Sequence, residues 1–315
     1  MIYIIVLNWN GAEDTISCVK SLLKSNYDNY NIIVVDNKST DNSYLKLKYE
    51  LPIIAGNPTN FFEISIENIK KHKCQRNKEI LLIQSGSNLG YAGGNNIGIL
   101  FALNQTDMEY VWILNNDTEV HPSAIEELII KCKSNSEIGI CGSRLILFDD
   151  RTKMQSLGGI HNKLLCTTKQ YAWMQNASIK YNDNEVAEKI DYVVGAAMFL
   201  TKRCLNNVGL LSEDYFLYFE ELDICLRAKS KGFLIGVCSE SHVYHKEGAS
   251  TGGGKNNIAD YYSIRNRLIV TRKFFPKFYI FVWLSLFGVA INRARRKEFE
   301  KMKTCLRIMF NINMQ

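Results

Sequence analysis

The chain has 315 residues, 46% of them hydrophobic, which is enough for one large domain or for one domain with an appendage. Its net charge of +6 is uneven, because residues 255–315 carry thirteen Lys and Arg against three Asp and Glu, whereas residues 1–254 are net acidic. This basic end contains no recognisable motif for reading nucleic acid, and charge alone gives only unspecific attraction, so we expect no nucleic-acid partner.

The cysteines and the N-terminus indicate the compartment. Nine cysteines include no CxxC pair and lie mostly within apolar runs, which predicts reduced core residues and a cytoplasmic location. The opening MIYIIVLNWNG lacks a basic region and a cleavage site, and its apolar run has the length of a strand. We therefore expect no signal peptide.

Short strands alternate with helices along the first half of the chain. Apolar, β-branched runs at residues 3–9, 31–37, 79–85 and 110–116 are typical of buried parallel strands, and helical stripes follow Asn10-Gly11 and HPSA (121–124). This order predicts an α/β fold, with a Rossmann-like, mostly parallel sheet and helices on both faces. Residues 45–78 are too long for a simple connection and are predicted to be a basic, helical insertion.

Polar residues follow every one of these strands. In open α/β sheets, ligands bind beyond the carboxyl ends of the strands, so these residues form the candidate site. They are Asn8, Trp9 and Asn10; Asp36 and Asn37; the segment GSNLGYAGGNNIG (86–98); and Asn115, Asn116 and Asp117.

The glycines of residues 86–98 do not spell GxGxxG and do not follow the first strand, and the chain has no P-loop. A Rossmann dehydrogenase and a P-loop enzyme are therefore disfavoured. The glycines would let backbone N–H groups approach a ligand, with Asn88, Asn95 and Asn96 as further donors. The alternative is a glycine-rich helix start with no ligand.

Asp117 ends a hydrophobic strand, where a carboxylate can hold a divalent cation if further ligands join it. The segment HVYHKEGAS (242–250) offers His242 and His245. In a strand these two residues have opposite parity, so we expect only one of them to face the site.

The segment YFLYFEELDICLRAKSKGF (215–233) places three carboxylates behind packed aromatic residues, at the start of a predicted helix. Capping explains part of this charge, and Asp223 with Arg227 forms an i,i+4 ion pair. At 100° per residue Glu220 and Asp223 share a face, whereas Glu221 projects away from it. Both capping and catalysis remain open from these residues alone.

The C-terminal region combines an uncharged run, FYIFVWLSLFGVAI (278–291), with the basic cluster RARRK (293–297). A helix of those fourteen residues would be about 21 Å long, shorter than the roughly 30 Å hydrocarbon core, so we do not expect it to span a membrane. Two interpretations remain. Residues 274–315 either contact a membrane surface with anionic head groups or form a buried helix with a solvated basic end.

The ordered motifs IIVLNWNG, VVDNKSTDNS, NLGYAGGNNIG, VWILNNDTEV, the segment from GAAMFLTKRC to LRAKSKGF, VYHKEGAS and YYSIRNRL resemble the family-two inverting glycosyltransferases of GT-A fold. The similarity covers roughly residues 1–270 and is greatest to the rhamnosyltransferase-like branch. It implies a GT-A domain at 1–254 with a helical appendage at 255–315. It also implies transfer of a sugar, rhamnose among the candidates, from a nucleotide-diphosphate donor to a glycan or lipid-linked glycan. A Mg²⁺ or Mn²⁺ ion would assist this transfer. The enzyme would act at the cytoplasmic face of a membrane.

The resemblance also assigns roles to donor-side and metal-side residues. The family's DxD element falls on residues 115–117, where Asn115 would be a neutral contact and Asp117 the metal-binding carboxylate, completed by His245. The other assignments are Asn8, Trp9, Asn10 and Asp36 for the base and ribose, Asn88, Gly90 and Asn95 for the nucleotide side, and Arg265 for the diphosphate.

The family's Glu-Asp pair falls on Glu220 and Glu221, which makes Glu221 the expected general base. Enclosure by aromatic side chains would raise its pKa by desolvation. Because Glu is one methylene longer than the usual Asp, Glu220 is the alternative base. Asp223 and Arg227 would support the turn.

Two other functions are compatible with such a sheet. A sugar-phosphate nucleotidyltransferase would need a phosphate loop rich in glycine and lysine after the first strand, and NWNGAEDT is not such a loop. A non-catalytic sugar-nucleotide-binding protein would keep both donor binding and any turnover when Glu221 is replaced by Gln.

Overall fold

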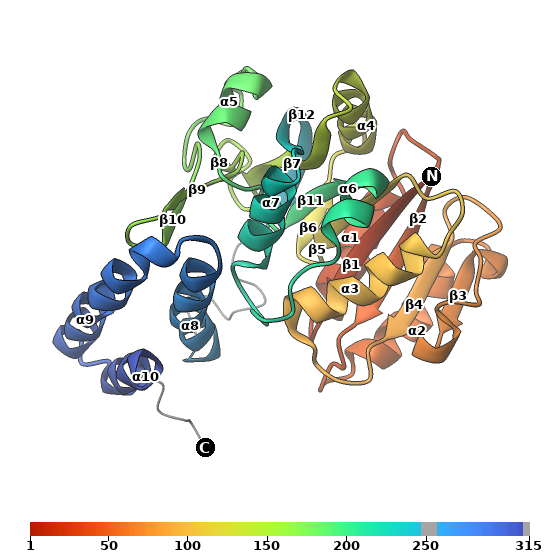
Figure 1. Cartoon of the computed structure of the whole chain (residues 1–315). Helices are drawn as coiled ribbons and strands as arrows, with labels where there is room; N and C mark the ends of the chain where they lie inside the picture. The colour runs from red at the N-terminus through yellow and green to blue at the C-terminus, as the bar shows by residue number, and fades with distance from the viewer. Residues whose placement is uncertain (247–256, 311–315) are drawn as a thin grey trace.

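The computed structural model describes residues 1–246 and 257–310, and Figure 1 shows a twisted central sheet flanked by helices. The sheet has ten strands, nine of them in the order β3-β4-β2-β1-β5-β11-β7-β12-β6, with β8 pairing to β7. The strands β1 (Ile2–Asn8), β2 (Tyr30–Asp36), β4 (Ile80–Gln84) and β5 (Tyr110–Asn115) are parallel and almost fully buried. They are the four predicted strands.

The second half of the sheet is mixed and brings distant segments together. β11 (Ala197–Thr201) runs antiparallel between β5 and β7 (Ile138–Leu147), and β12 (Leu234–His245) runs parallel to β7. The short β6 (Thr118–Val120) pairs with the end of β12, so that His245 lies opposite Thr118. β8 (Met154–Ser156) covers the edge of β7, and β9 (Gly159–Asn162) and β10 (Thr167–Gln170) form a separate hairpin.

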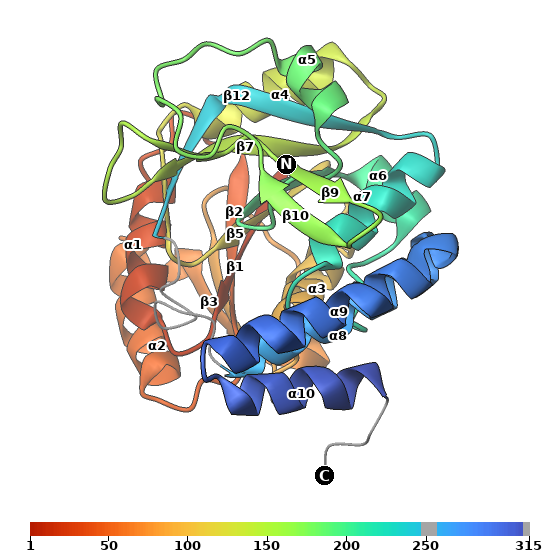
Figure 2. The ribbon, with the colours of Figure 1, turned by 90° about the vertical axis from the view of Figure 1, so that its left-hand side faces the viewer.

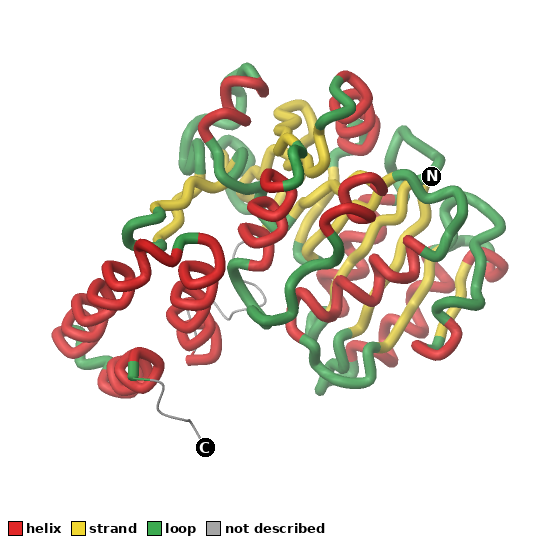
Figure 3. The backbone as a smooth tube through the Cα atoms, in the orientation of Figure 1, coloured by secondary structure: helices red, strands yellow, loops and turns green. Residues whose placement is uncertain are grey.

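Helices cover both faces of the sheet, as Figure 3 shows. A cluster of buried hydrophobic side chains lies on each face. This confirms the predicted GT-A architecture with its C-terminal helices. On one face lie α1 (Ala12–Leu22), α2 (Ser43–Ile54) and α4 (Ala124–Ser134). On the other lie α3 (Gly90–Leu103), α6 (Lys202–Val208) and α7 (Glu220–Ser230), while α5 (Asp183–Lys189) packs beside β12.

The glycines after β4 act differently from the expectation. Gly94 and Gly98 lie inside α3, where an added Cβ would come within 2.4 Å of Leu7 Cδ1 and 2.7 Å of Ile5 Cγ2. They allow α3 to pack closely on β1. The expectation that these two glycines bring backbone N–H groups to a ligand is therefore wrong.

The segment 45–78 contributes more than helix. After α2 the chain forms the short helix η1 (Pro58–Asn60), the edge strand β3 (Phe61–Ile64) and the short helix η2 (Ile66–Asn68). β3 pairs in parallel with β4 and so extends the sheet by one strand. The proposed domain boundary at 254/255 and residues 247–250 of the VYHKEGAS motif lie outside the described residues.

Three C-terminal helices pack together beside the sheet: α8 (Asn257–Phe274), α9 (Tyr279–Arg295), which follows the turn η4 (Pro276–Phe278), and α10 (Phe299–Met309). Figure 2 shows α9 and α10 lying side by side on the outside of this group. The apolar helix is longer than expected. Pro276–Arg295 is long and apolar enough to cross a membrane by length and composition, with a mean hydropathy of 1.2 and 22% of its most apolar window buried.

Candidate active site

Asp117 and His245 meet where β5 and β12 end. The Asp117 Oδ1 and His245 Nε2 atoms are 3.1 Å apart, and both side chains are buried. His245 Nδ1 donates a hydrogen bond to Gln155 Oε1 at 2.9 Å, which leaves Nε2, beside the carboxylate, as the nitrogen that can act as a ligand. Among the described residues, Asp117 Oδ1 has no hydrogen-bond donor. Two electron-rich atoms that face each other need a cation between them, either a proton or a metal ion, and the pair fits a divalent metal.

The two asparagines before Asp117 have different surroundings. Asn115 Nδ2 lies 3.4 Å from His245 Nε2, so this neutral side chain borders the Asp117–His245 pair. Asn116 Nδ2 donates to Gly11 O and Thr15 Oγ1, both at 3.1 Å, and therefore ties the end of β5 to the start of α1.

The residues after β1 and β2 form one hydrogen-bonded group. The buried Asp36 carboxylate accepts from Asn8 Nδ2 at 2.8 Å and from Ser39 Oγ at 2.5 Å. Asn10, which has a left-handed φ of 54°, donates from Nδ2 to Thr40 Oγ1 at 3.0 Å. Trp9 is 41% exposed beside them, so its indole is accessible at the rim of the sheet. An exposed aromatic face next to fixed polar groups suits a nucleobase and ribose.

The start of α3 contacts the loop that precedes α7. Gly90 has a φ of +69°, and a Cβ there would come within 2.3 Å of Phe216 O, so only glycine fits this position. Asn88 Oδ1 accepts from Asn37 Nδ2 at 3.1 Å and from Gly90 N at 3.0 Å. Asn95 is fully buried and donates to Tyr91 O, so it has no surface at the rim in this structure.

The loop at residues 215–219 has a strained backbone and is held on two sides. Phe216, Tyr218 and Phe219 have φ values of 60°, 68° and 77°, a region that bulky residues rarely adopt. On one side Tyr91 N donates to Phe216 O at 2.7 Å. On the other side the buried Asn266 donates from Nδ2 to the carbonyl oxygens of Tyr215, Leu217 and Tyr218, at 2.8, 2.8 and 3.0 Å.

Glu220 and Glu221 follow this loop as the first residues of α7. Burial raises the pKa of Glu221 to about 7, although backbone N–H groups at the helix start oppose the shift. Burial, and then the charge of Glu221, raises the pKa of Glu220 well above its usual range. Within the described part of the chain, neither Oε2 atom has a hydrogen-bond partner. Glu221 can therefore bind or release a proton near neutral pH.

Asp223 and Arg265 are occupied by contacts that hold this region together. The fully buried Asp223 carboxylate accepts from Tyr215 Oη at 2.9 Å, Arg227 Nε at 2.5 Å and Lys273 Nζ at 2.6 Å. It is thus an anchor for the loop rather than a free acid. Arg265 Nη1 donates to Asp214 O at 2.8 Å, next to the same loop.

Tyr91 connects the two acidic parts of the site. Burial raises the pKa of Tyr91 well above its usual range, and the negative charges of Glu220, Glu221 and Asp117 add to the shift. Its hydroxyl donates to Gly195 O at 2.6 Å. One side chain is therefore affected by the charge of all three carboxylates, although Asp117 lies more than 100 positions before Glu220 and Glu221 in the chain.

Three residues of this site had no role in the sequence-based assignments. Tyr91 and Asn266 lie within the motifs NLGYAGGNNIG and YYSIRNRL, which could have suggested them. Gln155, which orients His245, lies in a segment without any motif, and no local pattern indicates it.

Comparison with known sequences gives a consistent result. The sequence model of the family described as "Glycosyl transferase family 2" matches residues 3–52 and 45–208. The chain is 24% identical over 263 residues to the low-salt glycan biosynthesis hexosyltransferase Agl10 of Haloferax volcanii, covering 79% of this chain and 78% of that protein. It is also 24% identical to the dTDP-rhamnosyl transferase RfbF of Shigella flexneri, covering 70% of each.

Comparison with solved structures supports the fold. The mannosyltransferase PcManGT from Pyrobaculum calidifontis, solved with GDP-Man and Mn²⁺, aligns over 100% of this chain and 76% of its own, with a TM-score of 0.56 at 12% identity. The structure of S. aureus TarS residues 1–349 aligns over 85% of this chain, with a TM-score of 0.51 at 14% identity. This chain spans 64% of that one.

Proposed function

The chain belongs to glycosyl transferase family 2, and from that premise we propose that it is an inverting, metal-dependent hexosyltransferase. The donor would be a nucleotide-diphosphate sugar, with rhamnose among the candidate sugars, and the acceptor a hydroxyl of a glycan or lipid-linked glycan. The observation that carries this proposal is that Tyr91 joins the two sides of the site. Its backbone N–H donates to Phe216 O in the loop before Glu220 and Glu221, and its hydroxyl donates to Gly195 O, next to the Ala196 carbonyl that accepts from Asn115 N. Transfer needs a base and a charged donor site together.

Asp117 and His245 would hold Mg²⁺ or Mn²⁺, which when bound stabilises the charge of the departing diphosphate. Asn8, Trp9, Asn10 and Asp36 would hold the base and ribose, with Asn88 and Asn115 nearby. Glu221 would accept the proton of the acceptor hydroxyl while that oxygen attacks the anomeric carbon from the side opposite the leaving group. This attack forms the glycosidic bond, breaks the bond to the diphosphate and inverts the anomeric centre.

The proposal is tested by incubating the protein with Mn²⁺, a panel of nucleotide sugars and glycan acceptors, and by measuring nucleoside diphosphate release. The anomeric configuration of the product is then determined by NMR. We expect one donor to be turned over with inversion. Retention of configuration would contradict the assignment of Glu221 as a base, and the absence of turnover with every donor would favour a non-catalytic sugar-nucleotide-binding protein.

The rate of transfer should rise with pH through about 7. Glu221 must be deprotonated to act as a base, and burial raises its pKa to about 7. Below this value kcat should fall by about tenfold per pH unit, and above it kcat should level off. A pH profile of kcat at saturating donor checks this, with circular dichroism at each pH as the control for folding. A flat profile across pH 7 would contradict the assignment.

The appendage at 255–315 would be needed for catalysis by the domain at 1–254, because Asn266 holds the loop before Glu221. Asn266→Ala removes a donor shared by three carbonyl groups, so we expect kcat to fall by roughly tenfold with little change in the KM for the donor. Asn292→Ala, at an exposed asparagine of α9, is the matched control. Equal kcat in both variants, or a change in the KM alone, would show that Asn266 does not position the loop for catalysis.

We also propose that α9 contacts the inner face of a membrane. Its buried side includes Val282 and Leu286, whereas Ile280, Leu284, Phe287 and Ile291 form an exposed apolar stripe. The basic residues Arg295, Arg296 and Lys297 follow this stripe, and such a combination suits anionic lipid head groups.

Vesicle sedimentation tests this contact. The protein should bind vesicles that contain phosphatidylglycerol, and Leu284→Glu should weaken binding several-fold by placing a charge in the apolar stripe. Ile130→Glu, at an exposed aliphatic residue of α4, should bind like the unmodified protein. Self-association that Leu284→Glu abolishes, without vesicle binding, would instead identify the stripe as an interface between copies of the chain.

A further inference from the structure

A second group of metal-ligating side chains lies at the opposite end of the sheet, before the start of β4. A nitrogen of His72, the sulfur of Cys74 and a carboxylate oxygen of Glu79 all lie within 4.8 Å of one another. Glu79 precedes β4 directly, and its backbone N–H donates to Asn31 Oδ1 near the start of β2. The group is therefore separate from Asp117 and His245, which lie beyond the carboxyl ends of the strands.

Glu79 is only half satisfied by the protein. It is 1% exposed, and its Oε1 accepts from the backbone N–H groups of Gln75 and Arg76, both at 2.9 Å. Its Oε2 is buried and accepts no hydrogen bond from an N–H or O–H group among residues 1–246 and 257–310, although the thiol of Cys74 lies beside the carboxylate. A buried carboxylate oxygen without a donor is costly unless a cation is bound to it.

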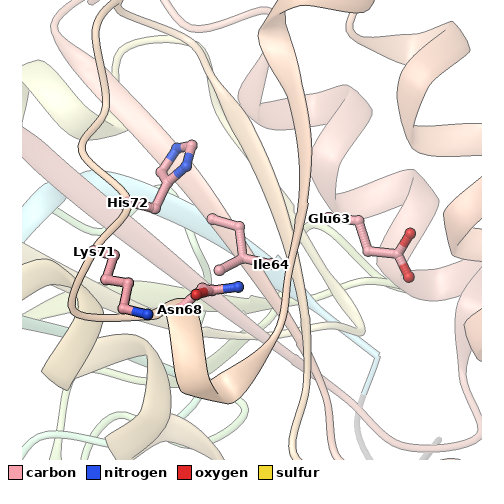
Figure 4. Close-up of a pocket in the computed structure, with 5 residues that line it drawn as sticks. All are labelled: Glu63, Ile64, Asn68, Lys71 and His72. Atoms are coloured by element: carbon pink, nitrogen blue, oxygen red, sulfur yellow. The ribbon is translucent and has the colours of Figure 1, made fainter.

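His72 and Cys74 supply the other two atoms that could bind a metal ion. His72 Nε2 is also buried without a hydrogen-bond partner in the described part of the chain, and its ring packs 4.8 Å from that of Phe62. Cys74 is the one partly exposed cysteine, whereas the other eight are buried. His72 also borders an open pocket of about 290 Å³. Figure 4 shows His72 with the other residues that line this pocket.

We propose that His72, Cys74 and Glu79 bind one zinc ion, with water as the fourth ligand. Imidazole and thiolate ligands favour Zn²⁺ over Mg²⁺ or Ca²⁺, which prefer oxygen ligands alone. Tetrahedral zinc needs its donor atoms about 3.5 Å apart, so the segment would close by roughly 1 Å around the ion. Binding releases the thiol proton of Cys74 to solvent. The ion would fasten residues 65–78 to the amino-terminal end of the sheet.

The test uses the full chain with the substitutions Asp117→Asn and His245→Gln, so that the proposed catalytic metal site cannot contribute. After removal of metal and addition of Zn²⁺, we expect one equivalent of zinc per chain by elemental analysis and a higher melting temperature. Adding Cys74→Ser or His72→Gln should abolish both effects. His121→Gln, at an exposed histidine away from the group, should leave both effects unchanged.

Cobalt provides a readout that does not require the Cys74→Ser or His72→Gln variants to fold. Co²⁺ added to the Asp117→Asn, His245→Gln chain should give an intense thiolate-to-metal charge-transfer band, because Cys74 is a ligand. The absence of this band would overturn the proposal. Zinc binding of equal stoichiometry and equal thermal shift in the Cys74→Ser chain would also overturn it.

Discussion

Glu221→Gln lowers kcat by roughly 10²–10⁴-fold, the range expected when a general base is lost. The amide has nearly the same shape as the carboxylate but cannot accept the proton of the acceptor hydroxyl. Because the predicted donor and metal ligands lie on other elements, binding of the nucleotide should be retained. Steady-state kinetics, with donor affinity measured separately, checks both parts of this expectation.

Glu220→Gln is the matched control for this prediction. Burial, and then the charge of Glu221, raises the pKa of Glu220 well above its usual range, which favours the protonated form of Glu220. An amide has nearly the same shape as a protonated carboxyl group and is also neutral. We therefore expect a decrease in kcat of less than about tenfold. If Glu220→Gln is the more damaging substitution, Glu220 is the base. If Glu221→Gln keeps full turnover, Glu221 is not the base.

Asp117→Asn is expected to have an effect of similar size for a different reason. Asp117 is the charged member of the pair with His245, and its removal leaves only neutral ligands for a divalent cation. The loss of charge stabilisation at the diphosphate, several kcal/mol, corresponds to roughly a 10³-fold lower kcat/KM. The activity that remains should no longer depend on the concentration of Mn²⁺. Kinetics at varied Mn²⁺ measures both quantities.

Gln155→Ala separates orientation from ligation at the same site. It removes the acceptor for His245 Nδ1 but keeps both proposed ligands, so the Mn²⁺ affinity should fall by about 10–100-fold while excess Mn²⁺ restores activity.

For Asp117→Asn, activity that still saturates with Mn²⁺ at the original concentration would place the metal elsewhere.

The sequence predicted those features that local patterns encode. Four apolar runs became the parallel strands, and the parity of His242 and His245 correctly indicated that only one faces Asp117. His242 instead lies beside His121, with ring centroids 5.8 Å apart. These features depend on spacing within a few residues, which hydrophobic periodicity reports directly.

Features that depend on pairing between distant segments were not visible. Gly94 and Gly98 of α3 were assigned to a ligand loop, because a sequence does not show that Leu7 and Ile5 lie against them. The antiparallel insertion of β11 between β5 and β7, and the contact of Asn266 with residues 215–218, join segments far apart in the chain. Such contacts arise from tertiary packing, which single-sequence patterns do not specify.

The central claim is that Asp117 and His245 form a metal-dependent donor site. The most direct test is whether nucleotide binding depends on metal binding. This dependence is measured as the melting temperature of the chain with UDP, GDP or dTDP, each with and without Mn²⁺. We predict that one nucleotide raises the melting temperature only when Mn²⁺ is present, in the unmodified chain and in Glu221→Gln but not in Asp117→Asn. Stabilisation that is independent of Mn²⁺, or that survives in Asp117→Asn, would contradict a donor site built on Asp117 and His245.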